Sequence, residues 1–117
     1  GRITLFEEGW VIEIDAGTID WSADMITFYN HVDDYSISKA EGTTGFKNEP
    51  GVGYDLDKDG TDDVAVVWED MDFNGKINAG DKFQITYKDT ASVSQEDIQN
   101  YVFRLSGTSL QYMQLHR

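Results

Sequence analysis

The chain has 117 residues and no cysteine, and its 22 acidic residues against 9 basic ones give a formal net charge of −13. A chain of this length can bury a core as one domain, and the lack of cysteine excludes disulfides and thiolate metal sites. The negative charge repels phosphate backbones and anionic lipid, so we expect no nucleic-acid partner and no membrane contact by this segment.

Apolar and polar residues alternate along much of the chain, which is typical of strands with one buried and one solvated face. The alternating runs, in chain order, are Trp10 to Ile14, Ile26 to Tyr29, Phe83 to Tyr87 and Tyr101 to Leu105. Val64 to Trp68 (VAVVW) is apolar at every position and predicts a central strand covered on both sides. Turn residues are expected between the strands, at Glu7 to Gly9, Asp15 to Gly17, Glu41 to Gly45, Asn48 to Gly53 and Ser106 to Ser109.

This pattern predicts an all-β fold, specifically an antiparallel β-sandwich, with a barrel-like closure as the alternative. A helix signal is found at Ser94 to Asp97 (SQED), a cap-like start that leads into Ile98 and Tyr101. It predicts one short helical turn at most. Because no repeat, linker or low-complexity tract interrupts the chain, we expect residues 1–117 to form a single domain.

Residues 55–81 hold nine of the 22 acids, and their first part has the spacing of a calcium loop. The expected ligands are Asp55, Asp57, Asp59, the backbone carbonyl of Thr61, and Asp63. Alternate residues point the same way, so three aspartates can converge on one ion while Gly60 permits the tight turn. Position 12 is Val66 instead of glutamate, so closure would fall to Asp63.

A second loop with the same spacing begins at Asp70. Its expected ligands are Asp70, Asp72, Asn74, the backbone carbonyl of Lys76, and Asp81. We expect weaker binding here, because Asn74 is neutral and Asp81 is shorter than the glutamate usual at position 12. Neither loop should lead into a helix, since strand-like sequence follows both.

Two simpler explanations compete with ion binding. Asp, Asn and Gly are the ordinary residues of turns, and a salt-adapted protein carries an acidic surface. A salt-adapted surface predicts scattered acids, whereas nine of 22 fall within one stretch of the chain. The strand between the loops would separate two ions by roughly 17 Å at about 3.3 Å per residue, too far for a two-metal catalytic centre, which needs about 4 Å. We therefore expect one or two structural Ca²⁺ ions.

No catalytic motif is present, and a non-catalytic protein is expected. His31 and His116 have no evident partner in the sequence, and paired acids such as Asp33-Asp34 are uninformative in so acidic a chain. The aromatic residues leave an alternative, a calcium-dependent carbohydrate-binding or adhesion module that stacks sugar rings on Trp21 and Tyr29. Its partner would be a polysaccharide.

Three segments resemble the soluble domain of archaeal type IV pilin-like surface proteins. They are Thr18 to Tyr29 (TIDWSADMITFY), Asp70 to Tyr87 (DMDFNGKINAGDKFQITY) and the closing strand pair from Tyr101 to Leu115. The first acidic loop also resembles the calcium hairpins of FG-GAP repeats, and the second resembles dockerin and EF-type loops. The resemblance implies an extracellular, cell-surface β-sandwich head, carried on an apolar N-terminal helix that would precede this segment. Its expected partners are other copies of itself or other cell-surface proteins.

Overall fold

The computed structural model of the protein describes residues 2–6, 9–14, 18–20, 26–39, 51–105 and 113–114. These residues form strands joined by turns, with one short 3₁₀ helix. The strands are β1 (Arg2–Phe6), β2 (Gly9–Glu13), β3 (Thr18–Asp20), β4 (Ile26–Asn30), β5 (Tyr35–Ser38), β6 (Val52–Tyr54), β7 (Val64–Glu69), β8 (Lys76–Asn78), β9 (Lys82–Tyr87), β10 (Tyr101–Leu105) and β11 (Met113–Gln114). The 3₁₀ helix, η2, covers Asp97–Asn100.

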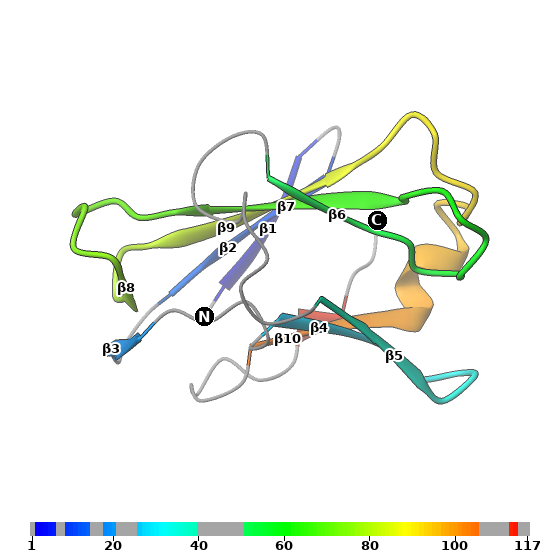
Figure 1. Ribbon diagram of the computed structural model, residues 1–117, viewed down its shortest axis with the longest axis horizontal. Coiled ribbons are helices and arrows are strands. Elements are labelled where there is room, and N and C mark those ends of the chain that lie inside the picture. Colours follow the sequence, from blue (N-terminus) through cyan, green and yellow to red (C-terminus); the bar gives the residue numbers. More distant parts are fainter. Residues whose placement is uncertain are drawn as a thin grey trace.

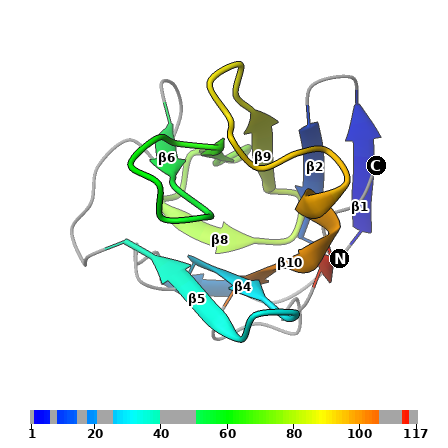
Figure 2. The ribbon, with the colours of Figure 1, turned by 90° about the vertical axis from the view of Figure 1, so that its right-hand side faces the viewer.

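The strands form an antiparallel β-sandwich, which confirms the predicted fold class (Figure 1). One sheet has the order β1-β2-β9-β7-β6 and the other has the order β11-β10-β4-β5, while β3 and β8 make a small separate pair. Figure 2 shows the first sheet above the second, with β4, β5 and β10 forming the lower layer. The closing pair of strands expected near the C-terminus is present as β10 and β11.

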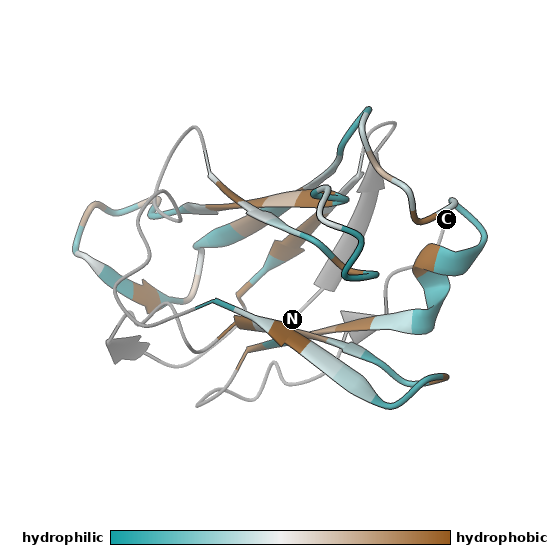
Figure 3. Cartoon of the chain, turned by 45° about the vertical axis from the view of Figure 1, so that its right-hand side comes forward, coloured by the Kyte–Doolittle hydropathy of each residue, from teal (hydrophilic) through white to brown (hydrophobic). Residues whose placement is uncertain are grey.

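The core lies between the two sheets because the alternating residues of each sheet turn their apolar side chains inward. Phe28 of β4 and Phe83 of β9 both pack against Phe103, with ring centroids 5.6 and 5.7 Å away. Trp10 and Trp68 are also buried and belong to the core. Hydrophobic positions, brown in Figure 3, recur along strands of both sheets. The Phe83–Phe103 contact joins strands of opposite sheets, whereas Phe28 and Phe103 are register partners within one sheet.

β7 is an interior strand of its sheet, paired with β9 on one side and β6 on the other. Val64, Val66 and Trp68 face the core, and Val67 on the opposite face is also buried, whereas Ala65 is only partly covered. The predicted central strand is thus confirmed, with incomplete cover on its outer face. The two acidic loops begin and end at this strand, so they lie at opposite ends of it (Figure 1).

Two of the expected turns include strand residues. Val52 and Gly53 belong to β6, and Gly9 begins β2 instead of ending a turn. Gly9 is needed there because a Cβ at this position would collide with the carbonyl of Ile85 in β9. The remaining expected turn residues, apart from Gly51, lie outside the described part of the chain. The helical turn expected before the Tyr101 strand is present at Asp97–Asn100, and Ser94 Oγ accepts the Asp97 N–H at 3.1 Å.

Candidate metal sites

The two acidic loops share the positive-φ residues and the acceptor bonds of one turn. Position 4 has a positive φ in both, 62° at Lys58 and 57° at Phe73, and so does the glycine at position 6. The side chain at position 1 accepts the glycine N–H, at 2.7 Å from Gly60 to Asp55 and at 2.8 Å from Gly75 to Asp70. The same turn at positions 4 to 6 is therefore repeated in the two loops.

The residues at position 5 are also used in the same way. The Oδ1 atom of Asp59 accepts the Thr61 N–H at 3.0 Å, and the Oδ1 atom of Asn74 accepts the Lys76 N–H at 2.9 Å. Exchange of aspartate for asparagine therefore leaves the local fold intact and removes one negative charge. Thr61 and Lys76, which donate these N–H groups, are the residues whose backbone carbonyls are expected to bind an ion.

In the first loop the structure brings four predicted ligands together. One carboxylate oxygen from each of Asp55, Asp57, Asp59 and Asp63 lies within 4.8 Å of the others. Desolvation, with the negative charge of Asp63, raises the pKa of Asp57. Hydrogen bonding by Ser92 and by the Thr61 N–H lowers the pKa of Asp59. The pKa values of Asp57 and Asp59 thus shift in opposite directions, and a divalent cation among the four carboxylates would replace their repulsion with coordination.

Asp63 closes the first loop from a fully buried position. Its Oδ1 atom accepts the backbone N–H groups of Ser92 and Val93 at 2.8 and 3.0 Å, and the Ser92 hydroxyl at 3.2 Å. Its Oδ2 atom accepts the Leu56 N–H at 2.8 Å. Since each carboxylate oxygen offers about two acceptor positions, Oδ2 keeps room for a cation.

In the second loop three predicted ligands come together, since oxygens of Asp70, Asp72 and Asp81 lie within 4.8 Å of one another. Asp81 is buried and accepts the Met71 N–H at 3.0 Å and the Asn78 N–H at 3.1 Å. Asn78 was not predicted as a ligand, yet its Nδ2 donates to Asp72 at 2.8 Å, and its buried Oδ1 accepts no hydrogen bond from any described residue. An amide oxygen in this position is a suitable calcium ligand.

The first loop is also held by the opposite sheet. The hydroxyls of Tyr35 in β5 and Tyr101 in β10 lie 2.8 and 3.0 Å from the Leu56 carbonyl and 2.7 Å from each other. Leu56 itself is fully buried in the core. Position 2 of the loop is therefore fixed by its N–H, its carbonyl and its side chain together, so the loop is part of the sandwich and not an appendage.

Sequence reasoning missed several residues that support the sites, namely Ser92, Asn78, Tyr35 and Tyr101. Asn78 could have been found, because it occupies position 9 of the second loop, the position that Asp63 holds in the first. Ser92 donates its hydroxyl to Asp57 at 2.8 Å, but it follows Asp57 at a distance along the chain that no local pattern covers. The two tyrosines alternate within strands and carry no signal of their hydrogen bonding.

The residues expected for other functions are placed as follows. His31 lies on the exposed turn after β4, with its Nε2 atom 3.1 Å from the Gln99 carbonyl. Tyr29 donates its hydroxyl to Asp34 at 2.7 Å, and the Arg104 guanidinium lies 4.1 Å from the centre of its ring. Trp21 and His116 lie outside the described residues.

Comparison of the chain with protein-family models, with curated proteins and with solved structures finds no match in any of the three. Among the described residues, no helix has the length and apolar character needed to cross a membrane. The fold and the two acidic clusters therefore define the protein only as an all-β sandwich whose loops could bind metal ions.

Proposed function

We propose that this is a non-catalytic, extracellular domain stabilised by one or two Ca²⁺ ions. The observation that carries the proposal is the repeated loop, in which two segments separated by β7 adopt the same turn and gather acidic oxygens. The shared spacing of Asp, Asn and Gly can account for the turn itself, so the weight falls on the acidic oxygens that both loops gather. Carboxylate, amide and carbonyl oxygens are the donors that hard divalent cations prefer.

The ions would act by stabilising the two ends of β7. Without a cation, four carboxylates in one loop and three in the other repel one another next to buried closing residues. A site with ten times more free calcium than its dissociation constant stabilises the folded state by about 1.4 kcal/mol. Two such sites would supply a large share of the 5–15 kcal/mol or so that is typical of a small domain.

We further propose that the domain is the exposed head of a pilin-like subunit, or of another cell-surface assembly. Support comes from the sequence resemblance and from the sandwich architecture. The carbohydrate-binding alternative has less support, because Trp10 and Trp68 are buried and Arg104 covers the ring of Tyr29.

Calorimetric titration with Ca²⁺, together with melting in calcium and in chelator, tests the metal-binding part. We expect one or two ions to bind and chelator to lower the melting temperature. Titration with Mg²⁺ as a control should show weaker binding, since Mg²⁺ demands stricter octahedral geometry. Melting that is indifferent to both calcium and chelator would leave the loops as ordinary turns.

A further inference from the structure

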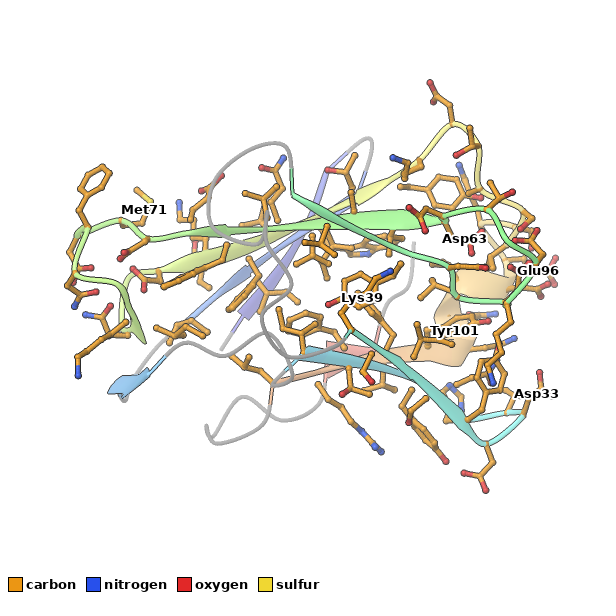
Figure 4. All side chains as sticks on the ribbon, in the orientation of Figure 1. Asp33, Lys39, Asp63, Met71, Glu96 and Tyr101 are labelled. Atoms are coloured by element: carbon orange, nitrogen blue, oxygen red, sulfur yellow. The ribbon has the colours of Figure 1, made fainter. Side chains whose placement is uncertain are left out.

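The second acidic loop carries the dipeptide Asn74-Gly75 at its positions 5 and 6. Of the five asparagines in the chain, Asn74 alone precedes a glycine. Both residues are exposed, and a Cβ built at Gly75 would meet nothing within 4 Å beyond the adjoining residues. Figure 4 labels Met71 of the same loop at one end of the molecule. The side-chain amide of Asn74 and the backbone nitrogen of Gly75 are therefore adjacent groups with open space around them.

An asparagine followed by glycine is able to lose its side-chain amide without an enzyme. The backbone nitrogen of Gly75 attacks Cγ of Asn74, the bond from Cγ to Nδ2 breaks, and Nδ2 leaves as ammonia with the proton of the Gly75 N–H. Water then opens the cyclic imide. Hydrolysis at Cγ leaves an ordinary aspartate at position 74, whereas hydrolysis at the backbone carbonyl leaves an isoaspartate, in which the main chain runs through Cγ.

The first acidic loop shows that an ordinary aspartate fits the same turn. Asp59 holds position 5 there, and its Oδ1 atom accepts the Thr61 N–H at 3.0 Å, as Oδ1 of Asn74 accepts the Lys76 N–H at 2.9 Å. An aspartate at position 74 can therefore keep this bond, and its negative charge would join the three carboxylates already gathered in the second loop. An isoaspartate adds a methylene to the main chain and cannot repeat the turn.

Two hydrogen bonds oppose the reaction while the loop is closed. The Gly75 N–H, which must lose its proton, donates to Oδ2 of Asp70 at 2.8 Å. The Asn74 side chain, which must rotate toward the Gly75 nitrogen, is held by the Lys76 N–H. Both bonds lie at exposed or partly buried positions of a loop end, where local opening costs least. The reaction therefore belongs to the transiently open loop, and an ion that closes the loop would slow it.

We propose that Asn74-Gly75 is a site of spontaneous deamidation, and that its aspartyl product gives the second loop the four carboxylates that the first loop already has. The calcium dependence of this change rests on the proposed function. A molecule that stays free of calcium would convert its weaker site into a stronger one by this route, because an added negative charge among the ligands raises affinity for a divalent cation.

Peptide mass spectrometry of the full chain, sampled during incubation in mildly alkaline buffer with chelator, tests the modification. The mass at Asn74 should rise by the difference between an oxygen atom and an NH group, with release of ammonia. Asn78, which precedes an alanine in the same part of the chain, is the internal control and should keep its amide. Asn74→Gln should stay unchanged, since glutamine closes a larger ring far more slowly. An Asn74 amide that persists as long as that of Asn78 would overturn the proposal.

The effect of the product on the metal site is tested with Asn74→Asp, which contains the aspartyl product alone. Calorimetric titration should show that the second loop binds Ca²⁺ about tenfold more tightly in Asn74→Asp than in freshly purified wild type, with binding at the first loop unchanged. Asn74→Gln, which stays neutral, should not gain affinity. Equal affinities in Asn74→Asp and the wild type would refute the predicted strengthening of the site.

The same incubation in calcium separates this proposal from the proposed function. With free calcium at ten times the dissociation constant, only about one loop in eleven is free of the ion, so deamidation should slow about tenfold. If Asn74 loses its amide equally fast in calcium and in chelator and calorimetry detects no bound ion, the proposed metal sites fail and the modification site stands. If calcium binds and Asn74 keeps its amide in chelator, the modification site fails and the metal sites stand.

Discussion

Asp63 and Asp81 hold the same place in the two acidic loops, although they follow the first aspartate of their loop at different spacings. Each accepts the backbone N–H of the loop's second residue, Asp63 from Leu56 at 2.8 Å and Asp81 from Met71 at 3.0 Å. Both are almost completely buried. The acid that closes each loop is therefore defined by its position in space and not by a fixed count along the sequence.

The two closing acids should differ in what they contribute to stability. Asp63→Asn would turn an amide donor toward N–H groups that now donate to the carboxylate, so we expect a loss of about 3 kcal/mol or more in the free energy of unfolding. Asp81→Asn should cost less, because Asp81 accepts two backbone N–H bonds and a longer one, 3.4 Å, from Trp68. Urea unfolding in chelator measures both without the contribution of a bound ion. Asp62→Asn is the matched control. Equal losses of unfolding free energy for Asp62→Asn and Asp63→Asn would contradict the stabilising role of the Asp63 carboxylate.

Chelator should lower the melting temperature of the wild type, and Asp57→Ala should abolish most of that dependence. Asp57 belongs to the cluster of four carboxylates, whereas the second loop gathers three and should bind more weakly. Losing the first site should remove about 1.4 kcal/mol of calcium-dependent stabilisation when free calcium is ten times the dissociation constant. Asp89→Ala removes an exposed acid outside both clusters and should leave the response to chelator unchanged.

The hydroxyls of Tyr35 and Tyr101 should show non-additive effects on stability. Three oxygens, those two hydroxyls and the Leu56 carbonyl, lie within 3.0 Å of each other and share two protons. Either single change to phenylalanine leaves the carbonyl one donor, so each should cost only about 0.5–1.5 kcal/mol. The double variant leaves a buried carbonyl without these donors and should cost more than the sum. A double-mutant cycle from urea unfolding checks this, and strict additivity would contradict the shared bond.

Stability should fall in alkaline solution. Burial raises the pKa of Tyr54 and, with the hydrogen bond to Tyr35, that of Tyr101 above the ordinary value of 10.0. The unfolded chain therefore loses these protons first, so the stabilisation is complete below about pH 10 and is lost as the pH rises further. Each tyrosine should add a slope of about 1.4 kcal/mol per pH unit above that point. Urea unfolding from pH 8 to 11.5, with tyrosinate absorbance recorded alongside, tests this, and Tyr101→Phe should reduce the slope.

The sequence predicts the fold best where strands are long and alternate cleanly. β2, β4, β9 and β10 follow from the period of two, and β7 follows from its unbroken apolar run. β6 escapes prediction because its three residues include Gly53, a residue typical of turns. β8 is also short, and its pairing with β3 depends on a contact between distant parts of the chain.

The candidate sites also combine residues that local spacing predicts with residues from distant segments that it does not predict. Side-chain positions within each loop follow from local spacing, because neighbouring residues must wrap one centre. The groups that hold Asp63 cannot be predicted from local spacing, because the donors Ser92 and Val93 lie about 30 residues later in the chain. The burial of Leu56 and the exposure of Met71 at equivalent positions likewise depend on which end of the sandwich each loop covers.

The difference between Leu56 and Met71 should make the two acidic loops open at different rates. Leu56 has its side chain in the core and its carbonyl on the opposite sheet, so large movements of the first loop require part of the sandwich to open. Met71 has no comparable anchor among the described residues, and its loop can open locally. The two ends should accordingly exchange their amide hydrogens, and any ion they hold, on separate timescales. The Leu56 amide would be protected for long periods and the Met71 amide only briefly.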